Sequence, residues 1–262
     1  MLFRSIRSTD VKTPVETRLA LDLLEGQHPG ADTELHYRNP FELLVATVLS
    51  AQSTDQRVNM VTPELFARYP DPRALAAASL ADVEVIIHST GFFRAKAKAV
   101  VGMASALVEK HKGVVPADMA SLTALPGVGR KTANVVLGHA LGIPGLPVDR
   151  HVLRVANRLG IADGDSPETV EAQLAAALPP DRWTRASDTL ILHGRRVCRP
   201  KPSCDECAAQ TVCTYASGVP NGPRAGTRPA RRRPARGGSG RRRPGSGPRR
   251  SGTSAPTRGK KR

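Results

Sequence analysis

Helix start signals recur along this chain, and they constrain the fold more than any other feature. A side chain able to cap a helix stands directly before a proline at Thr13-Pro14, Asn39-Pro40, Asp71-Pro72 and Ser166-Pro167. Proline is favoured in the first turn of a helix, and the capping oxygen accepts a hydrogen bond from a backbone N–H that the helix leaves unpaired. Apolar residues between these points recur at helical spacing, without strand-like alternation. The sequence therefore predicts an all-α fold of roughly ten short helices.

The positive charge of the chain is concentrated at its C-terminal end. The formal net charge is +16, and residues 219–262 contain fifteen Lys and Arg without one Asp or Glu, which leaves about +1 for residues 1–218. The segment also contains seven Pro and nine Gly. It has too few apolar side chains to offset the entropy of ordering, so we expect a disordered basic tail. The tail is either solubilising or an arm for a polyanion, and its two RRR runs favour nucleic acid.

Composition argues against several classes of protein. Only 9 of 262 residues are aromatic, which argues against folds that stack single-stranded bases on aromatic platforms. No apolar run reaches the roughly 18 residues of a membrane span, and residues 1–14 contain no signal-peptide core. We therefore expect no membrane contact and a reducing, cytoplasmic environment.

A glycine-rich turn at residues 125–129, with the sequence LPGVG, separates two helical patterns. Gly127 and Gly129 permit positive φ angles and a close backbone approach. The next helix presents unpaired N–H groups and the positive end of its dipole, which suit a phosphate. Arg130 and Lys131 lie in that first turn, where a cation interacts unfavourably with the dipole. An ordinary helix–helix turn is the alternative, but this pair of cations favours a phosphate site.

All four cysteines lie within 16 residues of one another, as Cys198-x5-Cys204-x2-Cys207-x5-Cys213. Disulfides are disfavoured in a reducing compartment. Zinc ribbons usually have two CxxC pairs with a longer loop between them. Here one central CxxC pair has a single cysteine on each side, which favours one compact centre such as an iron–sulfur cluster.

Three motifs together resemble the endonuclease III family, which comprises helix-hairpin-helix DNA base-excision glycosylases. They are LPGVGRKTANVVL at 125–137, VDRHV at 148–152 and the cysteine quartet, in that order. The resemblance covers residues 13–213 and leaves the tail out. It implies a monomeric enzyme, cytoplasmic and nucleoid-associated, that acts on double-stranded DNA with a damaged base or an abasic site.

The resemblance implies that Lys131 is the catalytic lysine and Asp149 the catalytic aspartate. A lysine amine can attack the sugar C1′, expel the base and form a Schiff base that leads to β-elimination. A carboxylate can stabilise the cationic transition state. From the residues alone, Lys131 is also suited to binding phosphate. The residues alone favour Asp149 as the cap of a helix over 150–159 that Gly160 ends, and the paired motifs reverse that preference. Arg150 stands where the family often has threonine.

Further site residues follow from the same resemblance. Gln52 matches the glutamine that fills the gap left by an extruded base, and Phe92 matches an apolar wedge position that is usually leucine. A core aromatic is the alternative for Phe92. Asp55 and His151 match positions that line the active site. Their alternatives are an N-cap for a helix over 56–68 and a helical histidine with its polar atoms satisfied.

The resemblance also implies that the quartet of Cys198, Cys204, Cys207 and Cys213 binds a [4Fe-4S] cluster. The family usually has six residues between the first two ligands, whereas this chain has five. Arg199 and Lys201 in that gap match a loop that lies near the DNA backbone. The DNA contacts expected at the hairpin are Gly127, Gly129 and Arg130.

Together these expectations describe a two-lobed molecule. A six-helix lobe spans 33–143 and includes the helix-hairpin-helix, residues 12–32 and 144–214 form the iron–sulfur lobe, and the active site lies between them. The expected function is a DNA glycosylase and AP lyase that removes oxidised pyrimidines. The alternatives are a related glycosylase for adenine mispairs or pyrimidine dimers, or a non-enzymatic helix-hairpin-helix protein. Lys131 and the lack of a second folded C-terminal domain disfavour the adenine enzyme, and Asp149 disfavours the non-enzymatic module.

Overall fold

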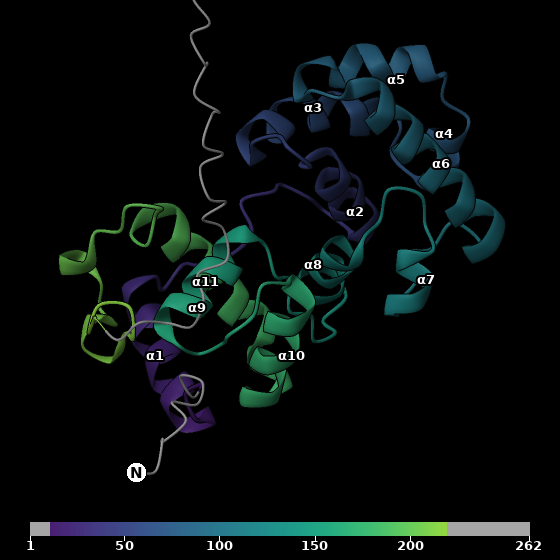
Figure 1. The fold of residues 1–262 in the computed structure, drawn as a ribbon. Helices are drawn as coiled ribbons and strands as arrows, with labels where there is room; N and C mark the ends of the chain where they lie inside the picture. Colours follow the sequence, from purple (N-terminus) through teal and green to yellow (C-terminus); the bar gives the residue numbers. More distant parts are fainter. Residues whose placement is uncertain (1–10, 219–262) are drawn as a thin grey trace, which may run out of the picture. The chain divides into compact units, whose positions relative to one another are not determined.

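The computed structural model describes residues 11–218, in which helices joined by loops are the regular structure and no strand occurs (Figure 1). The predicted all-α class is confirmed, whereas the predictions for the basic tail, residues 219–262, lie outside the described residues. Four short 3-10 turns accompany the α-helices. The α-helices are α1 (Pro14–Gln27), α2 (Pro40–Leu49), α3 (Asp55–Arg68), α4 (Pro72–Ala76), α5 (Leu80–Ile87), α6 (Phe93–His111), α7 (Met119–Thr123), α8 (Arg130–Ala140), α9 (Arg150–Leu159), α10 (Pro167–Ala177) and α11 (Trp183–Arg196).

The helices begin where the capping signals predict. Thr13 and Glu16 form a reciprocal capping box at the start of α1, with the Thr13 side chain accepting from the Glu16 N–H. The side chains of Asn39, Asp71 and Ser166, each followed by proline, cap α2, α4 and α10 by accepting from the backbone N–H of the third helical residue. Local chemistry therefore sets these boundaries.

One apolar core lies among helices α2 to α8. Its fully buried residues include Leu43, Leu44 and Leu49 of α2 together with Met103 and Leu107 of α6. The sequence predicts six helices for this part of the chain, but the structure has seven α-helices there. The predicted number is one too low, because α4 and α7 are only five residues long and a one-turn helix shows no period of its own by which to count it.

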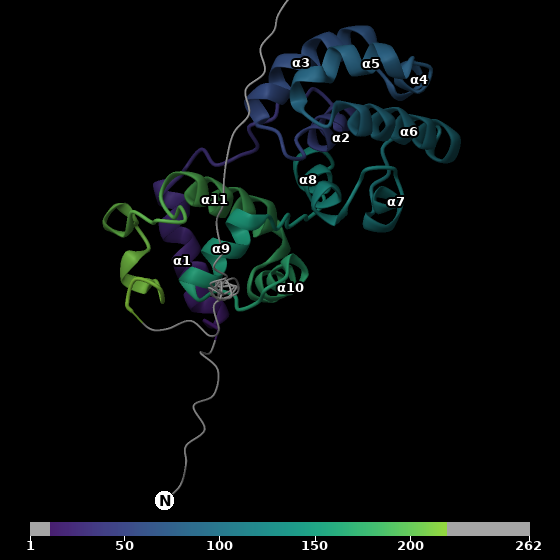
Figure 2. The ribbon, with the colours of Figure 1, turned by 45° about the horizontal axis from the view of Figure 1, so that its top comes forward.

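A second core joins the two ends of the described chain. Ala20, Leu21 and Leu24 of α1 are buried together with residues of α9, α10 and α11. Figures 1 and 2 both show α1 lying beside α9 and α11, far from its neighbour in sequence, α2. The loop that carries the four cysteines packs on this second core through Cys198, Cys207 and Cys213.

Candidate functional site

The two glycines of the 125–129 turn have different roles. Gly127 has φ +76°, and a Cβ atom there would lie 2.9 Å from the Cβ of Ala99. This position therefore needs glycine for both its conformation and its close approach to α6. Gly129 has φ −94° and an open surrounding, and it is the N-cap residue of α8 without any side-chain capping bond. The first turn of α8 is thus uncapped.

Arg130 and Lys131 are neighbours in that first turn, but only Arg130 is paired. Arg130 donates from Nε and Nη2 to the two carboxylate oxygens of Glu171 on α10, both at 2.8 Å. The hydrogen bonds and charge of Glu171 raise the pKa of Arg130. Lys131 is exposed, and its amine has no hydrogen bond or ion pair within residues 11–218. The cation predicted to contact DNA is therefore held in an ion pair, and its neighbour is free.

Asp149 caps α9, as one interpretation of the sequence predicts. Its Oδ1 accepts from the backbone N–H of His151 at 2.6 Å and of Val152 at 3.0 Å. The helix ends at Gly160, which has φ +80°. Within the described residues, Oδ2 of Asp149 has no hydrogen bond, and none joins Asp149 to Lys131. The cap fixes the carboxylate and leaves one oxygen available.

His151 follows Asp149 in the first turn of α9 and is half-buried. Burial lowers its pKa, an effect that the charge of Asp149 opposes and that of Arg154 reinforces. Arg154, which the sequence analysis did not single out, lies 3.1 Å from the ring Nδ1 and donates to the carbonyls of Gly194 and Cys198. The lowered pKa favours the neutral form of the ring beside Asp149.

Gln52 and Phe92 share a backbone feature that the sequence did not reveal. Their φ angles are +53° and +47°, and the third non-glycine residue with positive φ in the described chain is Lys112. Such conformations are strained for large side chains and gather at functional sites. Phe92 is 68% exposed, so it is not a core aromatic. Buried Lys96 donates to the carbonyl of Thr90 at 2.8 Å and supports the turn that presents Phe92.

Asp55 is not the N-cap of its helix. Thr54 caps α3, and Asp55 is the first helical residue because the Thr54 hydroxyl already accepts from the Arg57 N–H. Its Oδ2 accepts from Arg195 on α11 at 3.0 Å, and Arg195 also pairs with Glu34. The ion pair of Asp55 with Arg195 therefore joins α3, in the first core, to α11, in the second.

The four cysteine thiols line one pocket, with none joined in a disulfide. Burial and the neighbouring thiols raise the pKa values of Cys204 and Cys207, although a backbone hydrogen bond opposes the shift at Cys207. Among the described residues, one group of three His, Cys, Asp or Glu side chains has its ligand atoms within 4.8 Å of one another, as a single metal ion requires. That group contains no cysteine. Four thiols that line one pocket fit a polynuclear centre bound by four thiolates.

Arg158 holds the shortened Cys198–Cys204 segment in place. It donates to the carbonyls of Arg199 at 2.6 Å and Pro200 at 3.0 Å, and its guanidinium lies 4.8 Å from the ring centroid of Tyr215. Its Nη1 also lies 3.4 Å from Sγ of Cys198. The one-residue deletion therefore leaves a loop whose backbone is anchored by α9, and Arg199 and Lys201 are exposed on it.

Comparison with known proteins agrees with this fold. Residues 45–180 match the HhH-GPD superfamily of base excision DNA repair proteins. The chain is 50% identical to endonuclease III of Synechocystis sp. over 74% of this chain and 90% of that protein, and 42% identical to endonuclease III of Escherichia coli K12 over 76% and 95%. The solved structure of a trapped endonuclease III–DNA covalent intermediate has a TM-score of 0.75 at 41% identity, covering 79% of this chain and 98% of that one.

These matches first define the class: the chain is a helix-hairpin-helix enzyme of base excision DNA repair, a DNA glycosylase and AP lyase. More particularly, it belongs to the endonuclease III family. The resemblance given by the three sequence motifs is confirmed. In the described part of the chain, no helix is long and apolar enough to cross a membrane.

Proposed function

We propose that Lys131 is the nucleophile of this enzyme and that Asp149 stabilises the positive charge that develops on the sugar as the base departs. The observation that carries the proposal is the difference between neighbours: Arg130 is paired with Glu171, whereas the Lys131 amine is exposed and free. A free amine in an uncapped first turn is accessible to a DNA sugar whose phosphates the same helix end attracts. The carboxylate of Asp149, whose Oδ2 is free of hydrogen bonds within residues 11–218, supplies a negative charge that complements the cationic sugar.

The chemistry proceeds through a covalent lysine intermediate. The Lys131 amine attacks C1′ of the damaged nucleotide as the bond to the base breaks, and the base leaves with its bonding electron pair. The C1′–O4′ bond then breaks as a proton passes from the amine to O4′, which opens the sugar ring and gives the Schiff base. The Schiff base acidifies the C2′ proton, and loss of that proton breaks the C3′–O3′ bond, so that β-elimination cleaves the strand on the 3′ side with the phosphate as leaving group. Asp149 stabilises the positive charge that develops on the sugar and assists deprotonation of the amine. The trapped covalent complex of a related endonuclease III supports this route.

Gln52 and Phe92 are the residues that we assign to base extrusion. An enzyme that acts on a base in a duplex must remove it from the stack and fill the space it leaves. Both side chains are exposed on turns with a strained backbone, and Phe92 offers a large apolar surface to solvent. An exposed, pre-positioned aromatic ring is suited to insertion between base pairs.

The substrate we propose is an oxidised pyrimidine, such as thymine glycol, in double-stranded DNA, and the enzyme acts in the cytoplasm on nucleoid DNA. A panel of duplexes tests this, each carrying one lesion: thymine glycol, an adenine mispair, a pyrimidine dimer or an abasic site. Strand nicking should be fastest with the abasic site and thymine glycol. Preferential nicking of the dimer or release of mispaired adenine would assign another base specificity.

We propose that Cys198, Cys204, Cys207 and Cys213 bind a [4Fe-4S] cluster whose role is to stabilise the C-terminal part of the second core. Shared lining of one pocket and the spacing of the four cysteines along the sequence support this assignment. Purified protein should contain iron and sulfide with all thiols engaged, whereas stoichiometric zinc would contradict the assignment. Cys204→Ser should destabilise the second core, because ligand binding here contributes to folding.

A further inference from the structure

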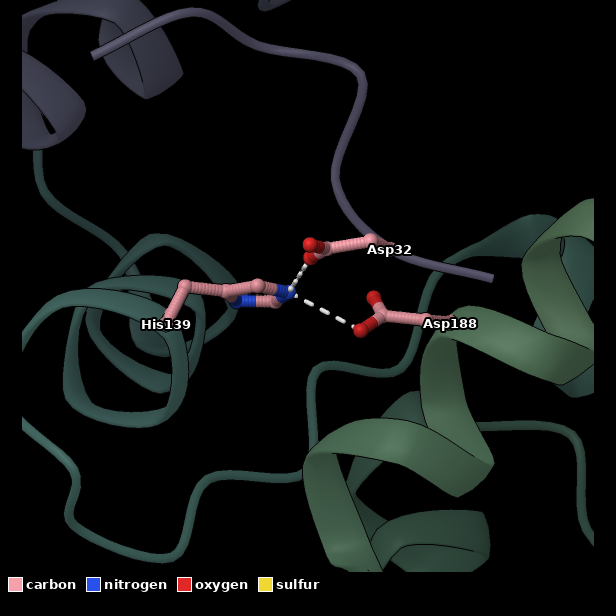
Figure 3. A group of neighbouring side chains, drawn as sticks. All are labelled: Asp32, His139 and Asp188. Atoms are coloured by element: carbon pink, nitrogen blue, oxygen red, sulfur yellow. Dashed lines mark hydrogen bonds and ion pairs between the residues drawn. The ribbon is translucent and has the colours of Figure 1, made fainter. Parts of the chain in front are cut away.

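A second group of metal-ligating side chains lies away from the cysteines. The ring Nε2 of His139 lies 2.9 Å from Oδ2 of Asp188 and 3.6 Å from Oδ1 of Asp32, and Figure 3 shows both carboxylates directed at that nitrogen. His139 is in the last turn of α8, Asp188 in α11, and Asp32 in the segment between α1 and α2. Lys131 is eight residues earlier on α8, about 12 Å along the helix axis, so this group is separate from the proposed active site.

The hydrogen bonds of His139 determine what this group can hold. Its Nδ1 lies 3.0 Å from the carbonyl of Val135, and a carbonyl only accepts, so Nδ1 carries the hydrogen. In the neutral ring, Nε2 then presents a lone pair to two carboxylates. Three electron-pair donors that converge on one point need a proton or a cation between them. A ligating histidine whose other nitrogen donates to a backbone carbonyl is the usual arrangement at protein metal sites.

The dimensions and charge of the group suit a metal ion. A tetrahedral zinc ion with bonds of about 2.1 Å separates its ligand atoms by roughly 3.4 Å, between the two distances observed. The His139 and Asp188 side chains are 5% and 8% exposed, whereas Asp32 is 74% exposed, which leaves one side open for entry of the ion and for water. The open side faces a pocket that a further carboxylate, Asp181, also lines. The negative end of the α8 dipole adds to the attraction for a cation.

We propose that Asp32, His139 and Asp188 form a binding site for a divalent transition-metal ion of the zinc type. The mixed set of one imidazole and two carboxylates is suited to such an ion, with water completing its coordination. Because α8 belongs to the first core and α11 to the second, the bound ion links the two cores. Its role is to fix α8, which carries Lys131, relative to α11.

Zinc titration of the untagged full-length protein tests this proposal. The protein is first freed of loosely bound metal by a chelator, and its cysteines are shown to be ligated by a free-thiol assay. Calorimetry should then show one saturable zinc site per chain, with a higher melting temperature and no change in the thiol count. Asp32→Asn, at an exposed position, keeps an oxygen that can accept from the Thr33 N–H but removes the charge, and it should weaken binding roughly tenfold or more. His139→Gln should abolish it.

Asp181→Asn is the matched control, since it removes a carboxylate from the same pocket without touching the three ligands. It should bind zinc with nearly the affinity of the unchanged protein. An unchanged protein that gives no saturable binding would overturn the proposal and show that a proton occupies the position between His139 and Asp188. Binding that Asp32→Asn leaves intact would also overturn it, because the ion would then be held elsewhere.

Discussion

The two helices that carry the proposed catalytic residues begin in opposite ways. α8 follows Gly129, which has no side chain to cap the helix, and its first turn presents the free amine of Lys131. α9 follows Asp149, whose carboxylate accepts from two backbone N–H groups of the first turn. One helix start is therefore open and positive, and the other is closed by a negative side chain.

This difference separates two tasks. Unpaired N–H groups at an open helix start can bind an incoming phosphate, which aligns the DNA beside the lysine. At the closed start, the capping bonds hold a carboxylate in a fixed position and leave its second oxygen for the substrate. Substitutions that change these two helix starts should show which of their features DNA binding and catalysis require.

Lys131→Gln should have the largest effect, because it removes the nucleophile from the open start. Borohydride reduces a Schiff base to a stable amine, so the unchanged protein should become covalently attached to DNA with an abasic site. The Lys131→Gln protein should still bind that DNA but give no trapped complex. Lys110→Gln, which changes an exposed lysine near the end of α6, is the control and should trap normally. Undiminished trapping by Lys131→Gln would place the nucleophile elsewhere.

Asp149→Asn should lower the rate of base excision by roughly a hundredfold or more, since it removes charge stabilisation of the sugar cation. Asparagine caps a helix about as well as aspartate, so the free energy of unfolding should change little. Lyase activity on a preformed abasic site should fall less, because the base has already departed. Single-turnover assays on both substrates measure the two rates. Full activity would mean that Asp149 serves only as a cap.

Gly127→Ala should disrupt the hairpin that leads into the open start. Alanine is strained at a φ of +76°, which costs about 1–2 kcal/mol, and its Cβ would contact Ala99 at 2.9 Å. Urea unfolding should show lower stability, and the affinity for duplex DNA should fall as well. Gly129→Ala is the matched control, because nothing lies within 4 Å of its added Cβ. Equal effects of the two substitutions would show that the conformation of Gly127 is unimportant.

Gly129→Ser should have the smallest effect and is the most direct test, because it gives α8 a capping side chain like that of α9. The backbone at this position is extended, as N-cap residues usually are. Stability should stay the same or rise by a few tenths of a kcal/mol. DNA binding should weaken by roughly 1 kcal/mol, about fivefold in Kd, as the hydroxyl occupies N–H groups meant for phosphate. Unaltered binding would show that the open start does not contact DNA.

Features set by local chemistry were predictable from the sequence. The start of α1 at Pro14, the cap by Asp149 and the end of α9 at Gly160 all follow from a few adjacent residues. The all-α class and the family follow from motifs of the same local kind. Asp55 shows the limit of such signals, because Thr54, one residue earlier, is the better-placed cap.

Features set by distant contacts were not predictable. Arg130 pairs with Glu171, 41 residues later, and His139 with Asp188, 49 residues later. Nothing near either residue in the sequence indicates its partner, and the DNA contact predicted for Arg130 stays a prediction. The positive φ angles of Gln52 and Phe92 were hidden for a related reason, since tertiary packing, not residue type, imposes them.

The position of α1 has a consequence for synthesis of the protein on the ribosome. α1 leaves the ribosome first, but its buried face packs against α10 and α11, and Gln27 at its end bonds to the backbone of Glu206 and Ala208. The first core is complete once α8 has emerged, whereas the partners of α1 are complete only after α11, which ends at Arg196. During that interval Leu21 and Leu24 lack the partners that bury them in the folded protein, so an apolar helix face is exposed on the nascent chain.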